Sequence, residues 1–147
     1  MTRLDRTVWG MAAEADEEVE SVSVEELRAE LDEGKEEEHV GAETVVVDVR
    51  DIREVWIEGS IPGAEHAPRG MIEFWADPET KYHKEFFDPG KRYVLFCNEA
   101  GRSALAAKRL REMGYRDVAH LDGGFTAWQE AGGEVADVPQ KDYEGDR

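Results

Sequence analysis

The single cysteine of this 147-residue chain, Cys97, occupies a position that favours a nucleophilic thiolate. It directly follows the apolar run Tyr93-Val94-Leu95-Phe96, and Gly101-Arg102-Ser103 then begins an alanine- and leucine-rich segment typical of a helix. Loop N–H groups and a helix N-terminus favour negative charge, and Arg102 adds a fixed positive charge, so we expect the sulfur to ionise readily. The alternative for a lone cysteine is a small buried core residue. The loop, the arginine and the helix together favour the nucleophile.

The residues between the cysteine and the helix are predicted to form an anion-binding loop. Their backbone N–H groups would surround the sulfur, and the same arrangement could hold a persulfide or an attacking oxyanion. We assign Arg102 to the bound anion, because a helix dipole does not stabilise an arginine at its N-terminus; the alternative is a solvated residue of the first turn. Arg69 is predicted at the rim of the pocket, where it would attract an anionic donor, or else as a surface arginine. The predicted catalytic residues are Cys97 and Arg102, and the predicted substrate-binding residues are Asn98, Glu99, Ala100, Gly101, Ser103 and Arg69.

The elements that must position this loop alternate between strands and helices. Residues 44–49 and 92–96 form near-continuous apolar runs, which are typical of strands buried on both faces, and residues 118–121 predict a short third strand. Ser23 can cap a helix that Gly34 ends. This pattern predicts an α/β fold whose central, mostly parallel sheet has helices on both faces. The other predicted helices cover residues 54–57, 70–75, 82–87, 102–113 and 125–131.

Composition limits the organisation and the partners of the chain. Residues 1–20 and 136–147 are acidic and poor in large apolar residues, so we expect them to be loosely ordered around one folded domain at residues 21–135. The net charge of −17 argues against nucleic-acid and anionic-lipid partners, and it reflects either solubility or a saline cytoplasm. Neither a signal peptide nor a membrane-spanning run is found, which predicts a cytoplasmic protein.

Four motifs together resemble the rhodanese family of single-domain sulfurtransferases. They are Val47–Arg50, Ile61–Ala64, Cys97–Ser103 and Leu121–Trp128, and their order and spacing match over roughly residues 20–133. The resemblance implies a cysteine that cycles between thiol and persulfide without a metal or an organic cofactor. A small-molecule donor such as thiosulfate or a mercapto acid would supply the sulfur, and a thiol, cyanide or a protein sulfur acceptor would remove it. It also implies that Glu54 faces the catalytic loop.

Loop length and loop composition separate three functions within this family. Four residues stand between Cys97 and Arg102, whereas phosphatases of the same fold have five, so the spacing favours sulfur transfer over phosphate hydrolysis. A non-catalytic binding module is the main alternative. It is favoured by Ala100, where relatives commonly have a glycine that could adopt a positive φ, and by Glu99, whose charge would oppose an anionic donor.

The remaining polar residues are expected to be structural. Asp48 and Arg50, at the end of the first buried strand, predict an ion pair or a hydrogen-bond network. The chain has four histidines, at positions 39, 66, 83 and 120, and their spacing does not suggest a metal site. We therefore interpret His120, at the end of a strand, as a packing residue. Gly123-Gly124 is interpreted as a turn before the last helix.

Overall fold

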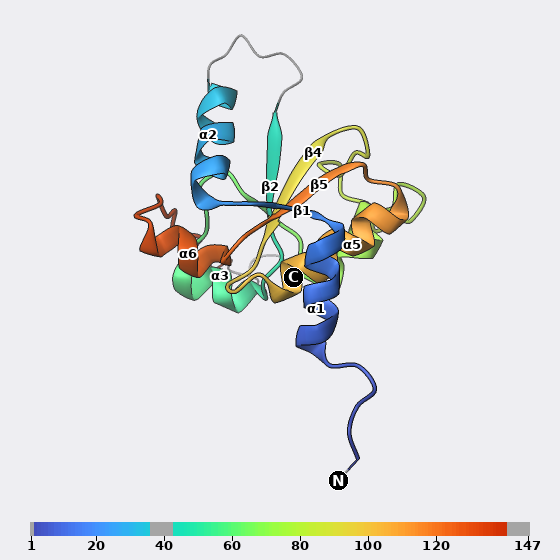
Figure 1. The fold of residues 1–147 in the computed structure, drawn as a ribbon. Coiled ribbons are helices and arrows are strands. Elements are labelled where there is room, and N and C mark those ends of the chain that lie inside the picture. The colour runs from blue at the N-terminus through green and yellow to red at the C-terminus, as the bar shows by residue number, and fades with distance from the viewer. Residues whose placement is uncertain (1, 36–42, 141–147) are drawn as a thin grey trace.

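A five-stranded, fully parallel sheet forms the centre of the molecule (Figure 1). The computed structural model describes residues 2–35 and 43–140. The strand order is β1-β5-β4-β2-β3, so the two strands predicted as most deeply buried, β2 and β4, are neighbours in its interior. The predicted α/β fold is therefore confirmed. The strands are β1 (Glu20–Val22), β2 (Thr44–Asp48), β3 (Glu65–His66), β4 (Arg92–Phe96) and β5 (Asp117–Leu121).

The described residues form six helices, which cover both faces of the sheet (Figure 1). Side chains alternate along each strand, so Tyr93 and Leu95 of β4 pack on one face while Val94 and Phe96 pack on the other. The first face is covered by α4 and α5, and the second by α2 and α6. The helices are α1 (Val8–Glu18), α2 (Val24–Lys35), α3 (Ile52–Glu58), α4 (Ile72–Ala76), α5 (Gly101–Met113) and α6 (Gly124–Glu130).

The N-terminal segment differs from the loosely ordered tail expected for residues 1–20. Residues 8–18 form α1, which packs along α5, and the chain then enters β1 at the edge of the sheet. Ala12 and Ala15 are buried, and Lys108 of α5 pairs with Glu18 at 2.9 Å. Two alanines one turn apart let the helix approach α5 closely even though the segment has few large apolar side chains. Low hydrophobicity was therefore a misleading sign of disorder.

Two other boundaries also differ from the expectation. Residues 82–87 form turns rather than a helix. Ala136, the first residue of the predicted C-terminal tail, is held by two backbone hydrogen bonds to Ser60, with N–O distances of 2.8 and 2.9 Å. Residues 141–147 of that predicted tail lie outside the described residues.

The parallel register brings the ends of β2 and β4 together. Asp48 is paired with Phe96, so the segments that follow these two strands leave the sheet side by side at its carboxyl edge. Ligands of open α/β sheets bind at this edge, because the loops there lie beyond the strand ends and next to helix N-termini. Cys97 is the first residue past this edge after β4.

Candidate active site

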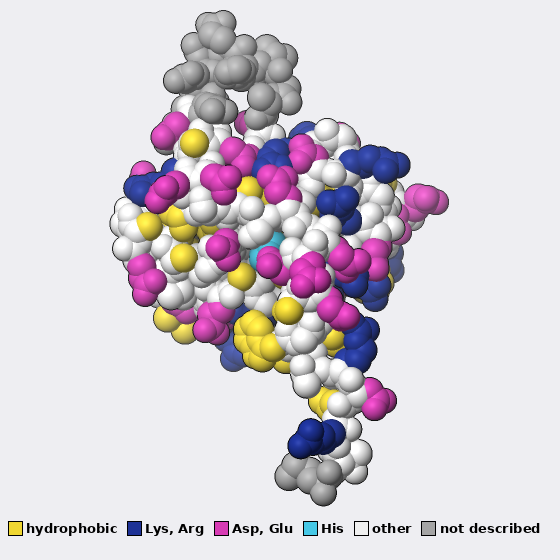
Figure 2. Space-filling model, in the orientation of Figure 1, with side chains coloured by type: hydrophobic (Ala, Val, Ile, Leu, Met, Phe, Trp, Pro, Cys, Tyr) yellow, Lys and Arg dark blue, Asp and Glu magenta, His cyan; other side chains and the backbone are white. Residues whose placement is uncertain are grey.

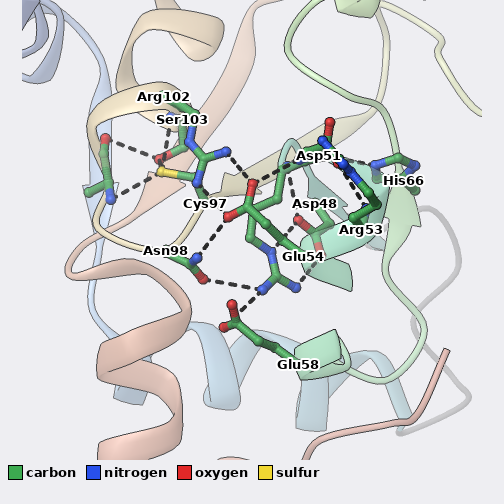
Figure 3. Close-up of polar contacts among 12 residues, drawn as sticks. Asp48, Asp51, Arg53, Glu54, Glu58, His66, Cys97, Asn98, Arg102 and Ser103 are labelled. Carbon is green, nitrogen blue, oxygen red and sulfur yellow. Dashed lines mark hydrogen bonds and ion pairs between the residues drawn. The ribbon is translucent and has the colours of Figure 1, made fainter. Parts of the chain in front are cut away.

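The sulfur of Cys97 lies in a cradle made by its own loop (Figure 3). Two backbone N–H groups donate to Sγ, from Ala100 at 3.1 Å and from Ser103 at 3.4 Å. The hydroxyl Oγ of Ser103 lies 3.6 Å from the same sulfur. The cysteine is only 1% exposed, so these protein dipoles rather than bulk water surround its sulfur. The predicted loop therefore forms around Sγ.

Ala100 adopts a backbone conformation that alanine rarely takes. Its φ is 81°, and it is the only non-glycine residue with a positive φ among those that the structure describes. This left-handed turn directs the N–H of Ala100 toward the sulfur and starts α5 at the next residue. The position that relatives commonly fill with glycine thus requires a positive φ here, and alanine occupies it at a conformational cost.

The remaining loop amides are available to a ligand. The N–H groups of Glu99, Gly101 and Arg102 make no hydrogen bond to any residue in the described part of the chain. The Glu99 side chain is exposed, so its charge lies at the mouth of the loop rather than inside it. These three N–H groups are therefore donors without a protein partner in the described part of the chain.

Arg102 is held by Glu54 of α3. Its guanidinium donates two hydrogen bonds to that carboxylate, at 2.7 and 2.9 Å, which is the bidentate geometry that arginine favours. These bonds are the main cause that lowers the pKa of Glu54 below its ordinary value, and they raise the pKa of Arg102. Glu54 therefore faces the loop that follows Cys97, and it balances the charge of Arg102.

Asn98 links the loop to the strand below it. Its Oδ1 accepts a hydrogen bond from Arg50 at 3.2 Å, and its Nδ2 donates to Glu54 at 2.9 Å. The prediction for Asn98 concerned its backbone N–H, which these side-chain contacts leave untested. The side chain has a separate role inside the protein, where it holds the loop against Arg50 and Glu54.

The predicted pair of Asp48 and Arg50 forms a buried network beneath the loop. Arg50 is 0% exposed and donates to both carboxylate oxygens of Asp48, at 2.9 and 2.7 Å, and to the carbonyl oxygen of Gly59 at 2.7 Å. Its guanidinium also lies 4.4 Å above the ring centre of Phe125. A buried charge is tolerated only when it is paired and hydrogen-bonded, and Arg50 meets both conditions.

The start of α6 supports the loop from behind. Phe125 N–H donates to the carbonyl of Cys97 at 2.7 Å, and Thr126 N–H donates to the carbonyl of Asn98 at 3.2 Å. A Cβ on Gly124, which has a φ of +62°, would lie 2.5 Å from both carbonyl oxygens. The sequence indicated a turn here, but it did not indicate that this turn contacts the loop that begins at Cys97.

Arg69 is not brought to the loop by any contact among the described residues. Its backbone N–H donates to the carbonyl of Val49, which places it near the carboxyl edge of the sheet. Its guanidinium pairs with Glu73 of α4 at 3.0 Å. The pocket-rim role predicted for Arg69 therefore lacks structural support, because an i, i+4 pair on the surface already uses its charge.

Two polar residues lie behind Ser103, an arrangement that the sequence did not predict, and one of them is the histidine interpreted as a packing residue. His120 of β5 is buried and its Nδ1 lies 3.3 Å from Ser103 Oγ, while its Nε2 lies 2.6 Å from Asp16 Oδ1. The alternation of side chains along β5 could have predicted the place of His120, because Val118 packs on the sheet face that also contains Cys97 and His120 is two residues further along. No pattern in the sequence predicted that Asp16 of α1 would reach this histidine.

The rest of the described surface offers no second site of comparable chemistry. Acidic side chains are spread over the face seen in Figure 2, as the net charge predicts. Among the described residues, which do not include His39, no group of three His, Cys, Asp or Glu side chains could hold a metal. No helix in the described ranges is long and apolar enough to cross a membrane. A cavity of about 470 Å³ borders Thr44, at the opposite end of β2 from the loop.

Comparison with protein families and known proteins finds rhodanese-like domains and sulfurtransferases as relatives. The family model of the Rhodanese-like domain matches residues 23–131. The chain is 35% identical over 89 residues to the thiosulfate sulfurtransferase GlpE of Pseudoalteromonas translucida, which covers 60% of this chain and 76% of that protein. It is 31% identical over 108 residues to the probable adenylyltransferase/sulfurtransferase MoeZ of Mycobacterium tuberculosis. That match covers 74% of this chain but spans only 24% of MoeZ.

Solved structures share the fold. A Rhodopseudomonas palustris protein of unknown function, described as a possible tyrosine phosphatase, has a TM-score of 0.82 and 38% identity, covering 92% of this chain and 98% of that one. The polysulfide-sulfur transferase of Wolinella succinogenes has a TM-score of 0.65 and 29% identity, covering 87% and 85%. The human single-domain sulfurtransferase TSTD1 has a TM-score of 0.62 and 26% identity, covering 75% and 95%.

Proposed function

Because this chain belongs to the rhodanese-like domain family, we propose that it is a sulfurtransferase whose nucleophile and sulfur carrier is Cys97. The observation that carries the proposal is the pair of N–H groups, from Ala100 and Ser103, that donate to Sγ. Donors fixed in place stabilise a charged sulfur without the reorganisation that water would need. The same N–H groups serve both the thiolate and the persulfide.

The proposed reaction has two displacements at sulfur. The thiolate of Cys97 attacks the outer sulfur of the donor, so a new S–S bond forms and the bond to the rest of the donor breaks, with its electron pair leaving on that remainder (sulfite, when the donor is thiosulfate). An acceptor nucleophile then attacks the outer sulfur of the persulfide. The S–S bond to Cys97 breaks, and its electron pair restores the thiolate.

The proposed donor carries a low negative charge near the transferred sulfur. Arg102 is the basic residue of the loop, but Glu54 balances it, and Glu99 adds an exposed carboxylate at the loop mouth. A mercapto acid with one carboxylate meets less repulsion from this loop than the thiosulfate dianion does. The free N–H groups of the loop would bind either donor. We therefore expect both donors to react, and the mercapto acid to react faster.

Phosphate hydrolysis is the second candidate, and one comparison favours it. The Rhodopseudomonas palustris structure that resembles this chain is described as a possible tyrosine phosphatase. Against it stands the short loop, with four residues between Cys97 and Arg102. Arg102 is also engaged by Glu54, which leaves the phosphate oxygens of such a substrate without a free guanidinium. Steady turnover of a generic aryl phosphate would reverse this order of preference.

Mass spectrometry of the intact protein tests the proposal. After incubation with thiosulfate or 3-mercaptopyruvate, we expect a gain of about 32 Da, the mass of one sulfur atom, that dithiothreitol removes. Cys97→Ser is the matched control and should show no gain. A folded protein that forms no adduct with either donor would contradict sulfur transfer and support the non-catalytic binding module.

A further inference from the structure

We propose that Asp16 and His120 form a proton-accepting pair that acts on the Cys97 thiol through Ser103. The inference rests on the proposed function only in taking Cys97 as the nucleophile. Asp16 of α1 and His120 of β5 lie outside the four motifs of the family resemblance. Because they act on the sulfur through Ser103, they are positioning residues rather than catalytic ones.

The first step concerns the tautomer of His120. Its Nε2 lies 2.6 Å from Asp16 Oδ1, and an ionised carboxylate can only accept a hydrogen bond. Nε2 must therefore carry a hydrogen, which leaves Nδ1 as the acceptor of the neutral ring. The partner within reach of Nδ1 is the hydroxyl of Ser103, with an N–O distance of 3.3 Å.

The second step concerns the hydroxyl of Ser103. Its oxygen lies between His120 Nδ1 and Cys97 Sγ, at 3.3 and 3.6 Å, and it also lies 3.2 Å from the carbonyl oxygen of Ala100. A hydroxyl has one hydrogen to donate and can accept at the same time. When that hydrogen points to Nδ1, the oxygen accepts the thiol hydrogen, and an uninterrupted path joins sulfur to imidazole.

The proton transfer along this path balances in atoms and charge. The S–H bond of Cys97 breaks and its proton joins Ser103 Oγ, while the hydroxyl proton of Ser103 moves to His120 Nδ1. The electron pair of the S–H bond stays on sulfur. The products are a thiolate, which Ala100 N–H and Ser103 N–H stabilise, and an imidazolium, which the carboxylate of Asp16 stabilises.

The charges around the path make this pair useful to the thiol. The charge of Arg102 from α5 acts on the sulfur, but Glu54 of α3 balances it, and Arg50, which follows β2, is already paired with Asp48 and Glu58. Glu99 in the loop is exposed. The imidazolium therefore adds a positive charge near a new thiolate, separated from it by Ser103 Oγ. Its counter-ion, Asp16 of α1, is 53% exposed, so solvent screens the opposing negative charge.

The test measures the thiol without any sulfur donor. The rate of Cys97 alkylation by iodoacetamide is followed from pH 5 to 10 for the full chain and for His120→Gln and Asp16→Asn. We expect the midpoint of the profile to move upward by about one pH unit in His120→Gln, which makes alkylation at pH 7 about tenfold slower, and by less in Asp16→Asn. Asp16→Glu should retain much of the wild-type profile, because it keeps a carboxylate.

Glu18→Gln is the matched control, since it removes the same charge from the same helix but at a carboxylate that pairs with Lys108. It should leave the profile unchanged. If His120→Gln fails to fold, Asp16→Asn decides, because Asp16 is half exposed. Folded variants with the wild-type profile would overturn the pair, whereas a shifted profile in a protein that never gains sulfur would overturn the proposed function instead.

Discussion

Arg102 and Glu54 make a two-point contact, with Nη1–Oε1 and Nη2–Oε2 distances of 2.7 and 2.9 Å. The contact joins the first turn of α5 to the first turn of α3, and Glu54 also accepts from Asn98 in the loop. A single carboxylate thus fixes two residues of the catalytic loop. Its ionisation is therefore important for the loop as well as for stability.

The ionisation of Glu54 predicts a loss of stability in acid. Its pKa is lowered in the folded protein, mainly by the hydrogen bonds from Arg102, so its contribution to stability is complete above its ordinary pKa of about 4.3. The contribution is lost as the pH falls through the lower folded value. Urea unfolding at pH 7 and at pH 3 should therefore show a smaller difference in Glu54→Gln than in the wild type. Glu130→Gln, at an exposed carboxylate, should keep the wild-type difference.

Ala100→Gly is expected to stabilise the protein. The left-handed φ of 81° strains alanine but not glycine, so the free energy of unfolding should rise by about 1 kcal/mol. Ala13→Gly, in the exposed middle of α1, is the control and should lower it by roughly 0.5–1 kcal/mol. Chemical denaturation measures both. A destabilised Ala100→Gly would show that the loop does not hold this backbone conformation in solution.

Gly124→Ala is expected to disrupt the catalytic loop. The new Cβ would lie 2.5 Å from the carbonyl oxygens of Cys97 and Asn98, so the hydrogen bond from Phe125 to Cys97 must break or the loop must move. Gly63→Ala has a similar positive φ, +81°, but its Cβ meets nothing within 4 Å. Both variants should lose about 1–2 kcal/mol to backbone strain, and Gly124→Ala should lose more and also lose persulfide formation. Equal losses with equal activity would contradict the supporting role of α6.

Glu99→Gln is expected to favour an anionic donor. Removing the exposed carboxylate at the loop mouth should raise kcat/KM for thiosulfate by roughly two- to fivefold at low salt, and the gain should shrink as salt screens the charge. The gain for a mercapto acid should be smaller. Glu130→Gln should change neither value. A gain that does not depend on salt would assign the effect to loop geometry instead of charge.

The local pattern of the sequence was sufficient for the central part of this protein. An apolar strand, Cys97, a short loop and an alanine-rich helix predict the cradle, because each of these features depends on residues next to one another in the chain. The same is true of Asp48 and Arg50, whose buried pair follows from two polar residues at the end of an apolar strand. The number of residues between Cys97 and Arg102 is likewise known from the sequence alone.

Contacts between distant segments were decided by the tertiary structure alone. Asp16 and His120 stand 104 residues apart, and the packing of α1 on α5 together with the pairing of β1 with β5 brings them together. The same packing ordered an acidic segment that was predicted as loose, and the fold paired the Arg69 guanidinium with Glu73. Composition and spacing report the local preferences of the backbone, but the direction of a polar side chain depends on which partner the fold places within reach. For this reason the sequence predicted where the sulfur lies, and only the structure placed a buried histidine behind Ser103.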